Sequence, residues 1–203
     1  AKSPMGHIIN MEFDGVSPSV KTGDIVEGSY LKLCLGRGLT NATARFSQTG
    51  LDYATEGVLL LTDASKIATA LMNSGLERIY KVKIKGEVTQ AIEDAMMNGL
   101  ELLDASAGGH SHSKVTSMTF APFIGYKIQK SEHNYSILKI AISEGQNREI
   151  RRFFAHFGTE VADLKRVSFA EVELNNLPTG KSRFLTRSEY SALFTFMKGD
   201  EKK

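Results

Sequence analysis

An aspartate, Asp52, lies in the glycine-bounded segment Gly50 to Gly57, directly before the apolar run Val58 to Leu61. A carboxylate in a turn that leads into a buried strand is held at the edge of a sheet, where an acid or base can face a substrate. Most aspartates in such segments serve only to reverse the chain. The pattern by itself therefore indicates a candidate catalytic carboxylate and does not name a reaction.

A second segment, Arg148 to Phe157, has the spacing of an amphipathic helix, with apolar residues at positions 150, 153, 154 and 157. At about 100° per residue, Arg148 and Arg152 lie opposite the apolar stripe, whereas Arg151 lies at its edge. An arginine at the edge can reach into a cleft, and beside Asp52 it would keep the carboxylate ionised. The alternative for Arg151 is a surface guanidinium without a specific role.

The elements around these residues alternate irregularly between strands and helices. We expect a strand at 58–62 and a helix capped by Asp63, then a half-buried strand at 80–88 and a helix enclosed by Thr89 and Gly99. Further strands are expected at 114–120, 135–142, 167–174 and 183–185, and the capping-box residues Thr186 to Glu189 begin a last helix. Strands joined partly by turns and partly by helices predict an α+β fold with a mixed, mostly antiparallel sheet and flanking helices.

The composition is that of an ordinary globular protein. Apolar residues make up 41% and charged residues 24% of the 203 residues, and the formal net charge of +2 gives no global basic field. The apolar runs are far shorter than the ~18 residues of a membrane span, and no apolar signal segment is seen. The single cysteine, Cys34, agrees with a reducing compartment, so we expect a cytoplasmic protein without a membrane partner.

Four segments carry a resemblance to a known family. Leu51 to Thr62 (LDYATEGVLLLT) resembles the catalytic segment of the ribosomal RNA pseudouridine synthases of the RsuA/RluB/RluE/RluF family. Three further segments follow in that family's order and approximate spacing: Tyr80–Gly86, Glu144–Arg152 and Leu164–Arg166. The resemblance covers residues 51 to 187, whereas residues 1–50 match poorly.

The resemblance implies a pseudouridine synthase catalytic domain at 51–197, after the segment 1–50 and before a charged tail at 198–203. It also implies a reaction without cofactor or metal. By carry-over, Asp52 is the catalytic aspartate, Tyr80 the active-site tyrosine and Arg151 the basic partner of the aspartate. The residues expected to bind the substrate are Ile150, as an apolar wall, and Arg78, Lys81, Asn147, Arg148, Arg152, Lys165 and Arg166.

The implied partner is ribosomal RNA, with the large subunit preferred over the small one, and we expect a monomer without a protein partner. The target uracil would be flipped into a pocket. Asp52 would then attack C1′, add to C6, or remove a ribose proton to give a glycal, and these three routes stay open.

Three alternative functions fit parts of the sequence. An RNA-binding module with weak or no activity is plausible because Thr49 and Gly50 stand where the family has Gly-Arg. A nucleotide hydrolase is suggested by Thr179 to Ser182, but the phosphate-binding loop needs a glycine where this chain has Asn175. A metal site at His110 and His112 lacks the further ligands that such a site needs.

Overall fold

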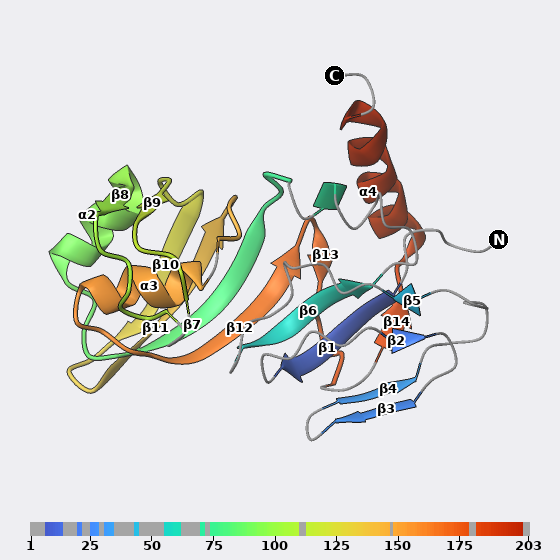
Figure 1. The fold of residues 1–203 in the computed structure, drawn as a ribbon, viewed down its shortest axis with the longest axis horizontal. Helices are drawn as coiled ribbons and strands as arrows, with labels where there is room; N and C mark the ends of the chain where they lie inside the picture. Colours follow the sequence, from blue (N-terminus) through green and yellow to red (C-terminus); the bar gives the residue numbers. More distant parts are fainter. Residues whose placement is uncertain are drawn as a thin grey trace. The chain divides into compact units, whose positions relative to one another are not determined.

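The computed structural model describes residues 7–13, 20–21, 25–28, 31–34, 43–44, 55–61, 70–71, 74–109, 113–146, 148–178 and 182–200. The chain divides into two compact units. The first unit consists of residues 1–76 and 166–203, and the second unit of residues 77–165. Figure 1 shows the elements of both, and each unit is described by itself.

The second unit is built on an antiparallel sheet in the order β10-β11-β7, with β12 next to β7. Its strands are β7 (Arg78–Lys85), β10 (Gly125–Ser131), β11 (Tyr135–Ile142) and the start of β12 (Val161–Phe169). Helices α2 (Gln90–Asn98) and α3 (Glu149–His156) lie on one side of this sheet, as Figure 1 shows. A two-stranded sheet of β8 (Leu100–Leu102) and β9 (Met118–Phe120) accompanies the helices.

The core of the second unit follows from the alternation along its strands. In β7 the buried residues Tyr80, Val82 and Ile84 alternate with exposed lysines. They share one core cluster with the buried helix residues Ile92, Met96, Phe153 and Phe154. Full burial of each such side chain contributes roughly 1.5–3 kcal/mol, so this cluster dominates the stability of the unit.

Helix α2 begins and ends where the sequence predicts. The Thr89 hydroxyl accepts a hydrogen bond from the Ile92 backbone N–H at 3.4 Å. Gly99 ends the helix with φ 81°, and a Cβ there would lie 2.6 Å from the Phe120 carbonyl oxygen. Both the backbone conformation and the close approach therefore require glycine at this position.

The first unit has the strand order β12-β6-β1-β14, and β13 pairs with β12. Its strands are β1 (His7–Phe13), β6 (Thr55–Leu61), β13 (Val172–Glu173), β14 (Ser182–Phe184) and the end of β12. Two short pairs complete it, β2 (Val20–Lys21) with β5 (Thr43–Ala44) and β3 (Ile25–Gly28) with β4 (Leu31–Cys34). Its core contains Val58, Leu71, Phe169, Val172, Leu174 and Leu193.

Helix α4 (Arg187–Asp200) begins at the predicted capping box. The Thr186 N–H donates to Glu189 Oε2 at 2.7 Å, and the Glu189 N–H donates to Thr186 Oγ1 at 3.3 Å. Arg183 Nη2 lies 2.7 Å from Glu189 Oε1, which lowers the pKa of Glu189 and raises that of Arg183. The carboxylate thus fixes both the helix start and the strand before it.

The predicted α+β class is confirmed, while several element bounds were wrong. The strand expected at 167–174 is two strands, β12 and β13, separated by a turn in which Ala170 and Glu171 have φ of 50° and 66°. The strand expected at 114–120 is reduced to β9, and β10 was not predicted. The helix expected after Asp63 lies mostly outside the described residues.

No helix in the described ranges combines the length and the apolar character needed to cross a membrane.

Gly57 offers a test of the first unit. Its φ is 127°, and a Cβ would lie 2.1 Å from the Arg166 carbonyl oxygen, so Gly57→Ala strains the backbone and separates β6 from β12. We expect the free energy of unfolding to fall by about 3 kcal/mol or more, as measured by chemical denaturation. Gly75→Ala is the matched control, because nothing lies within 4 Å of its Cβ position. Equal effects of the two substitutions would contradict the assigned packing.

Candidate active site

Tyr80 is the predicted active-site tyrosine, and it lies in the part of the chain that the structure describes. It lies in β7, its Cα is paired with that of Ile140 in β11, and its side chain is 9% exposed. The alternation of β7 places Tyr80 on the side that carries α2 and α3, and Lys81 on the opposite side, where it is exposed. Tyr80 and Lys81 therefore lie on opposite sides of the sheet, as the alternation of the sequence predicts.

The segment Glu144 to Arg152 leads into α3 through an unusual backbone conformation. Arg148 has φ 51° and ψ 32°, in the left-handed region, and its Nε donates to the Gly108 carbonyl oxygen at 2.7 Å. Gly108 has φ 73°, and a Cβ there would lie 2.6 Å from the Arg151 carbonyl oxygen. The loop before β9 is thus packed against the first turn of α3 and fixes where that helix starts.

Ile150 and Arg151 project from this first turn. Ile150 is buried in the same core cluster as Tyr80 and Val161. Arg151 is half-buried, and its Nη1 donates to the Val161 carbonyl oxygen at 3.1 Å, at the start of β12. The structure therefore brings Tyr80, Ile150 and Arg151 into one region of the second unit, with the guanidinium anchored on a backbone carbonyl.

Three arginines that we expected to contact RNA phosphates are instead enclosed in the fold. Arg78 is 1% exposed and donates to the Ser143 carbonyl oxygen at 2.8 Å. Arg152 is 0% exposed and donates to the Ala105 carbonyl oxygen and, at 2.7 Å, to Ser113 Oγ. Arg166 is 4% exposed and donates to the Val58 carbonyl oxygen at 2.8 Å.

A phosphate oxygen cannot reach a guanidinium that is covered by protein on all sides and already donates to backbone carbonyls. The expectation for Arg78, Arg152 and Arg166 is therefore corrected from phosphate binding to holding loops and strands in place. Burial lowers the pKa of Arg152, and the nearby charge of Arg148 lowers it further.

Glu149 is a residue of the site region that sequence reasoning missed. It is 7% exposed, and its Oε2 accepts a hydrogen bond from the Gln146 N–H at 2.9 Å. Burial raises the pKa of Glu149 to about 7 and the charge of Glu144 raises it too, whereas the Gln146 hydrogen bond and the charge of Arg78 lower it. The spacing of Gln146 and Glu149 could have revealed it. At the start of a helix, an acidic side chain often accepts a hydrogen bond from the backbone N–H three residues earlier.

The remaining predicted residues divide into two sets. Lys165 is half-buried at the end of the second unit's stretch of chain. Asp52 and Asn147 lie outside the described residues, as do His110 and His112. In the part of the chain that the structure describes, no group of three or more His, Cys, Asp or Glu side chains is arranged to hold a metal ion.

The fold and the sequence of the chain are similar to those of proteins named pseudouridine synthases. The chain is 52% identical over 155 residues to a Helicobacter pylori (strain J99) protein named "Uncharacterized RNA pseudouridine synthase", covering 76% of this chain and 59% of the relative. It is 32% identical over 145 residues to "Ribosomal large subunit pseudouridine synthase B" of Bacillus subtilis, covering 70% of this chain and 54% of the relative. A solved structure described as "Crystal structure of pseudouridylate synthase" is 27% identical with a TM-score of 0.56, covering 71% of this chain and 58% of that one.

The resemblance to pseudouridine synthases that the sequence predicts is thereby confirmed, and the chain is a homologue of proteins so named. The chain belongs to the family described as "Protein of unknown function (DUF3373)", whose model matches residues 1–190. The chain spans 59% of the Helicobacter pylori relative and 54% of the Bacillus subtilis relative.

Glu149 makes a prediction about pH. Because its pKa is raised to about 7 in the folded protein, the folded state binds a proton more tightly than the unfolded state, and stability falls as the pH rises from about 4.5 to about 7. Glu149→Gln keeps the acceptor for the Gln146 N–H without the charge. In the wild type, the free energy of unfolding should fall over this range by at most on the order of 3 kcal/mol, and in the variant we expect this fall to be absent. Denaturation at several pH values measures it, and parallel pH profiles for variant and wild type would contradict it.

Arg152 tests the corrected role of the buried arginines. Arg152→Met removes the donors to the Ala105 carbonyl and to Ser113 from an enclosed position, so we expect the free energy of unfolding to fall by about 2–4 kcal/mol. Chemical denaturation measures the loss, with the exposed Lys114→Met as the control. If Arg152→Met instead left stability unchanged and weakened RNA binding, Arg152 would be a phosphate contact after all.

Proposed function

We propose that this chain isomerises a specific uridine of ribosomal RNA to pseudouridine. The observation that carries the proposal is the 52% identity over 155 residues to a protein named as an RNA pseudouridine synthase. The name of the Bacillus subtilis relative supports ribosomal RNA of the large subunit as the substrate class. The α+β fold of this chain agrees with its structural similarity to a solved pseudouridylate synthase.

The chemistry of this reaction limits what the protein has to supply. The bond between C1′ and N1 of the uridine breaks, a bond between C1′ and C5 forms, the proton on C5 is lost and N1 gains one. Product and substrate have the same composition, so the reaction consumes no oxidant, reductant or co-substrate. The protein must extract the base from its stack, hold it against an apolar wall and place a carboxylate at the sugar.

The residues that we assign to these tasks follow the resemblance. Asp52 is the carboxylate that acts on the nucleotide, Tyr80 and Ile150 form the wall against which the uracil lies, and Arg151 is the cation that favours the ionised carboxylate. The burial of Tyr80 and Ile150 in one core cluster supports a rigid wall. The bond from Arg151 to the Val161 carbonyl supports a guanidinium with a restricted orientation.

A second function is an RNA-binding module with weak or no activity. The observation that favours it is Gly50, which stands where the resembled family has an arginine before the Leu-Asp pair. Without that side chain, extraction of the base from the stack rests on other groups. The two functions differ in whether RNA leaves the protein with a new pseudouridine.

Asp52→Asn separates these possibilities. The amide neither acts as a nucleophile nor removes a proton, so we expect pseudouridine formation in protein-free ribosomal RNA to fall by at least about a hundred-fold, with RNA affinity retained. Asp163→Asn is the matched control, because Asp163 is an exposed aspartate of β12. Activity that survives Asp52→Asn would exclude this aspartate, and a wild-type chain that converts no uridine would favour the module. Mapping pseudouridines in cells with and without the gene would name the site.

A further inference from the structure

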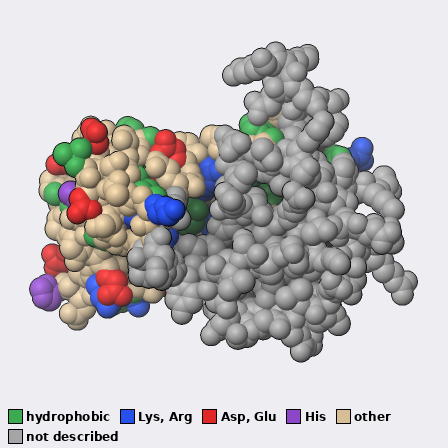
Figure 2. All heavy atoms as spheres, viewed as in Figure 1, with side chains coloured by type: hydrophobic (Ala, Val, Ile, Leu, Met, Phe, Trp, Pro, Cys, Tyr) green, Lys and Arg blue, Asp and Glu red, His purple; other side chains and the backbone are tan. Residues whose placement is uncertain are grey.

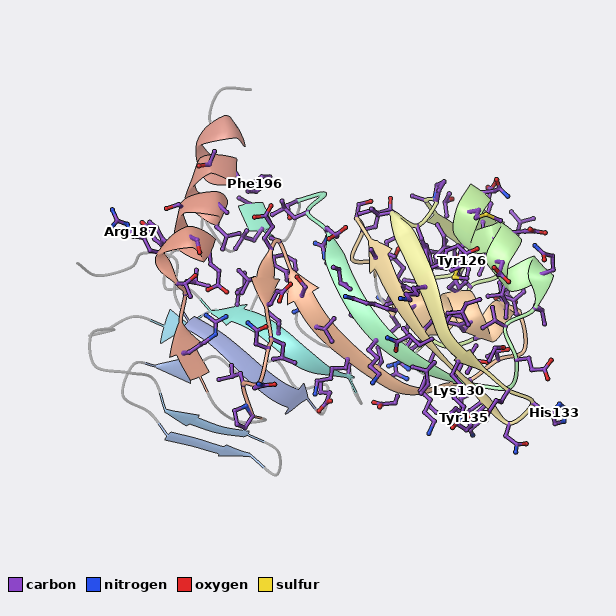
Figure 3. The ribbon with its side chains drawn as sticks, turned by 180° about the vertical axis from the view of Figure 1, so that it is seen from behind. Tyr126, Lys130, His133, Tyr135, Arg187 and Phe196 are labelled. Atoms are coloured by element: carbon purple, nitrogen blue, oxygen red, sulfur yellow. The ribbon has the colours of Figure 1, made fainter. Side chains whose placement is uncertain are left out.

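The side of the second unit's sheet that faces away from α2 and α3 carries a group of lysines, which we call the lysine face. It is seen toward the viewer in Figure 3, where Lys130 and Tyr135 lie together near the end of the β10–β11 hairpin. The lysine face consists of Lys81 and Lys83 of β7, Lys139 and Tyr135 of β11, and Lys127 and Lys130 of β10.

Three of these lysines form one row across three strands. Lys139 is directly opposite Lys127 on one side and directly opposite Lys81 on the other. Like charges in directly opposed positions of neighbouring strands repel, because their Cβ atoms are about 5 Å apart. All three side chains are exposed, and among the described residues none of them forms an ion pair or a hydrogen bond. The row therefore carries a repulsion that an anion from outside the protein would relieve.

Two neighbouring lysines show the contrast. Lys85 Nζ lies 2.5 Å from Glu160 Oε2, and Lys130 Nζ lies 2.9 Å from Glu132 Oε1, so both charges have a carboxylate of this chain beside them. The opposite side of the unit, which carries the helices, differs from the lysine face because it has both acidic and basic side chains. The helix-bearing side, viewed in Figure 2, shows Asp and Glu side chains spread among the basic ones.

An aromatic ring lies next to the lysine row. Tyr135 is half-exposed on the same face, with Lys83 Nζ 4.7 Å and Lys130 Nζ 4.6 Å from the centre of its ring. Lys130 Nζ also donates to the Tyr135 hydroxyl, which raises the pKa of Lys130. Proteins that hold single-stranded nucleic acid combine cations for the phosphates with aromatic side chains on a pleated sheet, and this face carries both kinds of group.

We infer that the lysine face binds the phosphate backbone of RNA, as a second contact surface on the side of β7 opposite Tyr80. The identification of the anion as RNA rests on the proposed function. An acidic protein or an anionic membrane would also satisfy the charge, but the half-exposed Tyr135 ring beside the lysines favours a nucleic acid. The apolar residues on this side, Ile79 and Ile137, are half-buried and offer a membrane little to insert.

The test removes the row and compares it with a charge-retaining variant. Lys81→Gln, Lys127→Gln and Lys139→Gln are combined in one chain, and the same three positions are changed to Arg in another. The probe is a fluorescein-labelled single-stranded 20-nucleotide polyuridine, titrated at about 50 to 200 mM KCl. We expect the Gln variant to bind about ten-fold more weakly at the middle of that range, and its salt slope to be shallower by about two units. The Arg variant should bind like the wild type.

A matched pair of single variants sharpens the result. Lys139→Gln should weaken binding and flatten the salt slope, whereas Lys85→Gln should change little because Glu160 already neutralises Lys85. The melting temperature of the triple Gln variant without RNA should be unchanged or higher, because the repulsion across the row is gone. If the triple Gln variant binds RNA more weakly but is as stable as the wild type, the loss of binding is due to the missing lysines and not to unfolding.

Two results would overturn the inference. One is RNA affinity and salt slope unchanged in the triple Gln variant. The other is a triple Gln variant that no longer binds vesicles with 30% phosphatidylserine, which the wild type binds, but still binds polyuridine. That result would assign the face to a membrane. Pseudouridine formation is measured separately, so a chain that converts no uridine yet loses RNA affinity with the row contradicts the proposed function and leaves the lysine face standing.

Discussion

The start of helix α3 is held by ionic side chains that are buried against backbone groups. Arg148 reaches the Gly108 carbonyl, Arg152 the Ala105 carbonyl, and Glu149 accepts from the Gln146 N–H. A buried charge is tolerated only when dipoles of the protein replace the lost water. The charged side chains and the loops that supply these dipoles therefore hold each other in place. The placement of Ile150 and Arg151 next to the core that contains Tyr80 depends on this mutual arrangement.

The parts of the fold that the sequence predicts well are those specified by neighbouring residues. Strand β11 matches the expected 135–142, and α2 lies between Thr89 and Gly99, because alternation and capping are local signals. Strand β10 escaped prediction because its register shifts between Ile128 and Lys130, which interrupts the alternation. Strand β12 starts earlier than expected because Ala162 and Asp163 are both exposed, which hides the period of two.

The candidate site was likewise predictable only in part. Tyr80, Ile150 and Arg151 were proposed as site residues because they fall in contiguous motifs, but a motif records which residues are charged and not which are enclosed. Arg152 donates a hydrogen bond to the carbonyl oxygen of a residue 47 positions away. Arg166 donates to the carbonyl oxygen of a residue 108 positions away. Such partners come together only through the tertiary fold, so the sequence could not separate the guanidinium groups that hold the structure from those that face solvent.

Strand β1 lies between β6 and β14, so residues near the start of the chain pair with residues beyond position 180. During synthesis β1 therefore has to wait for residues 182–184 before its second edge is covered. The second unit, by contrast, is one continuous stretch of chain and has its partners at hand much earlier. Folding on the ribosome should therefore be sequential, with the contiguous unit formed first. In the other unit, one edge of β1 stays open to mispairing until β14 has been synthesised.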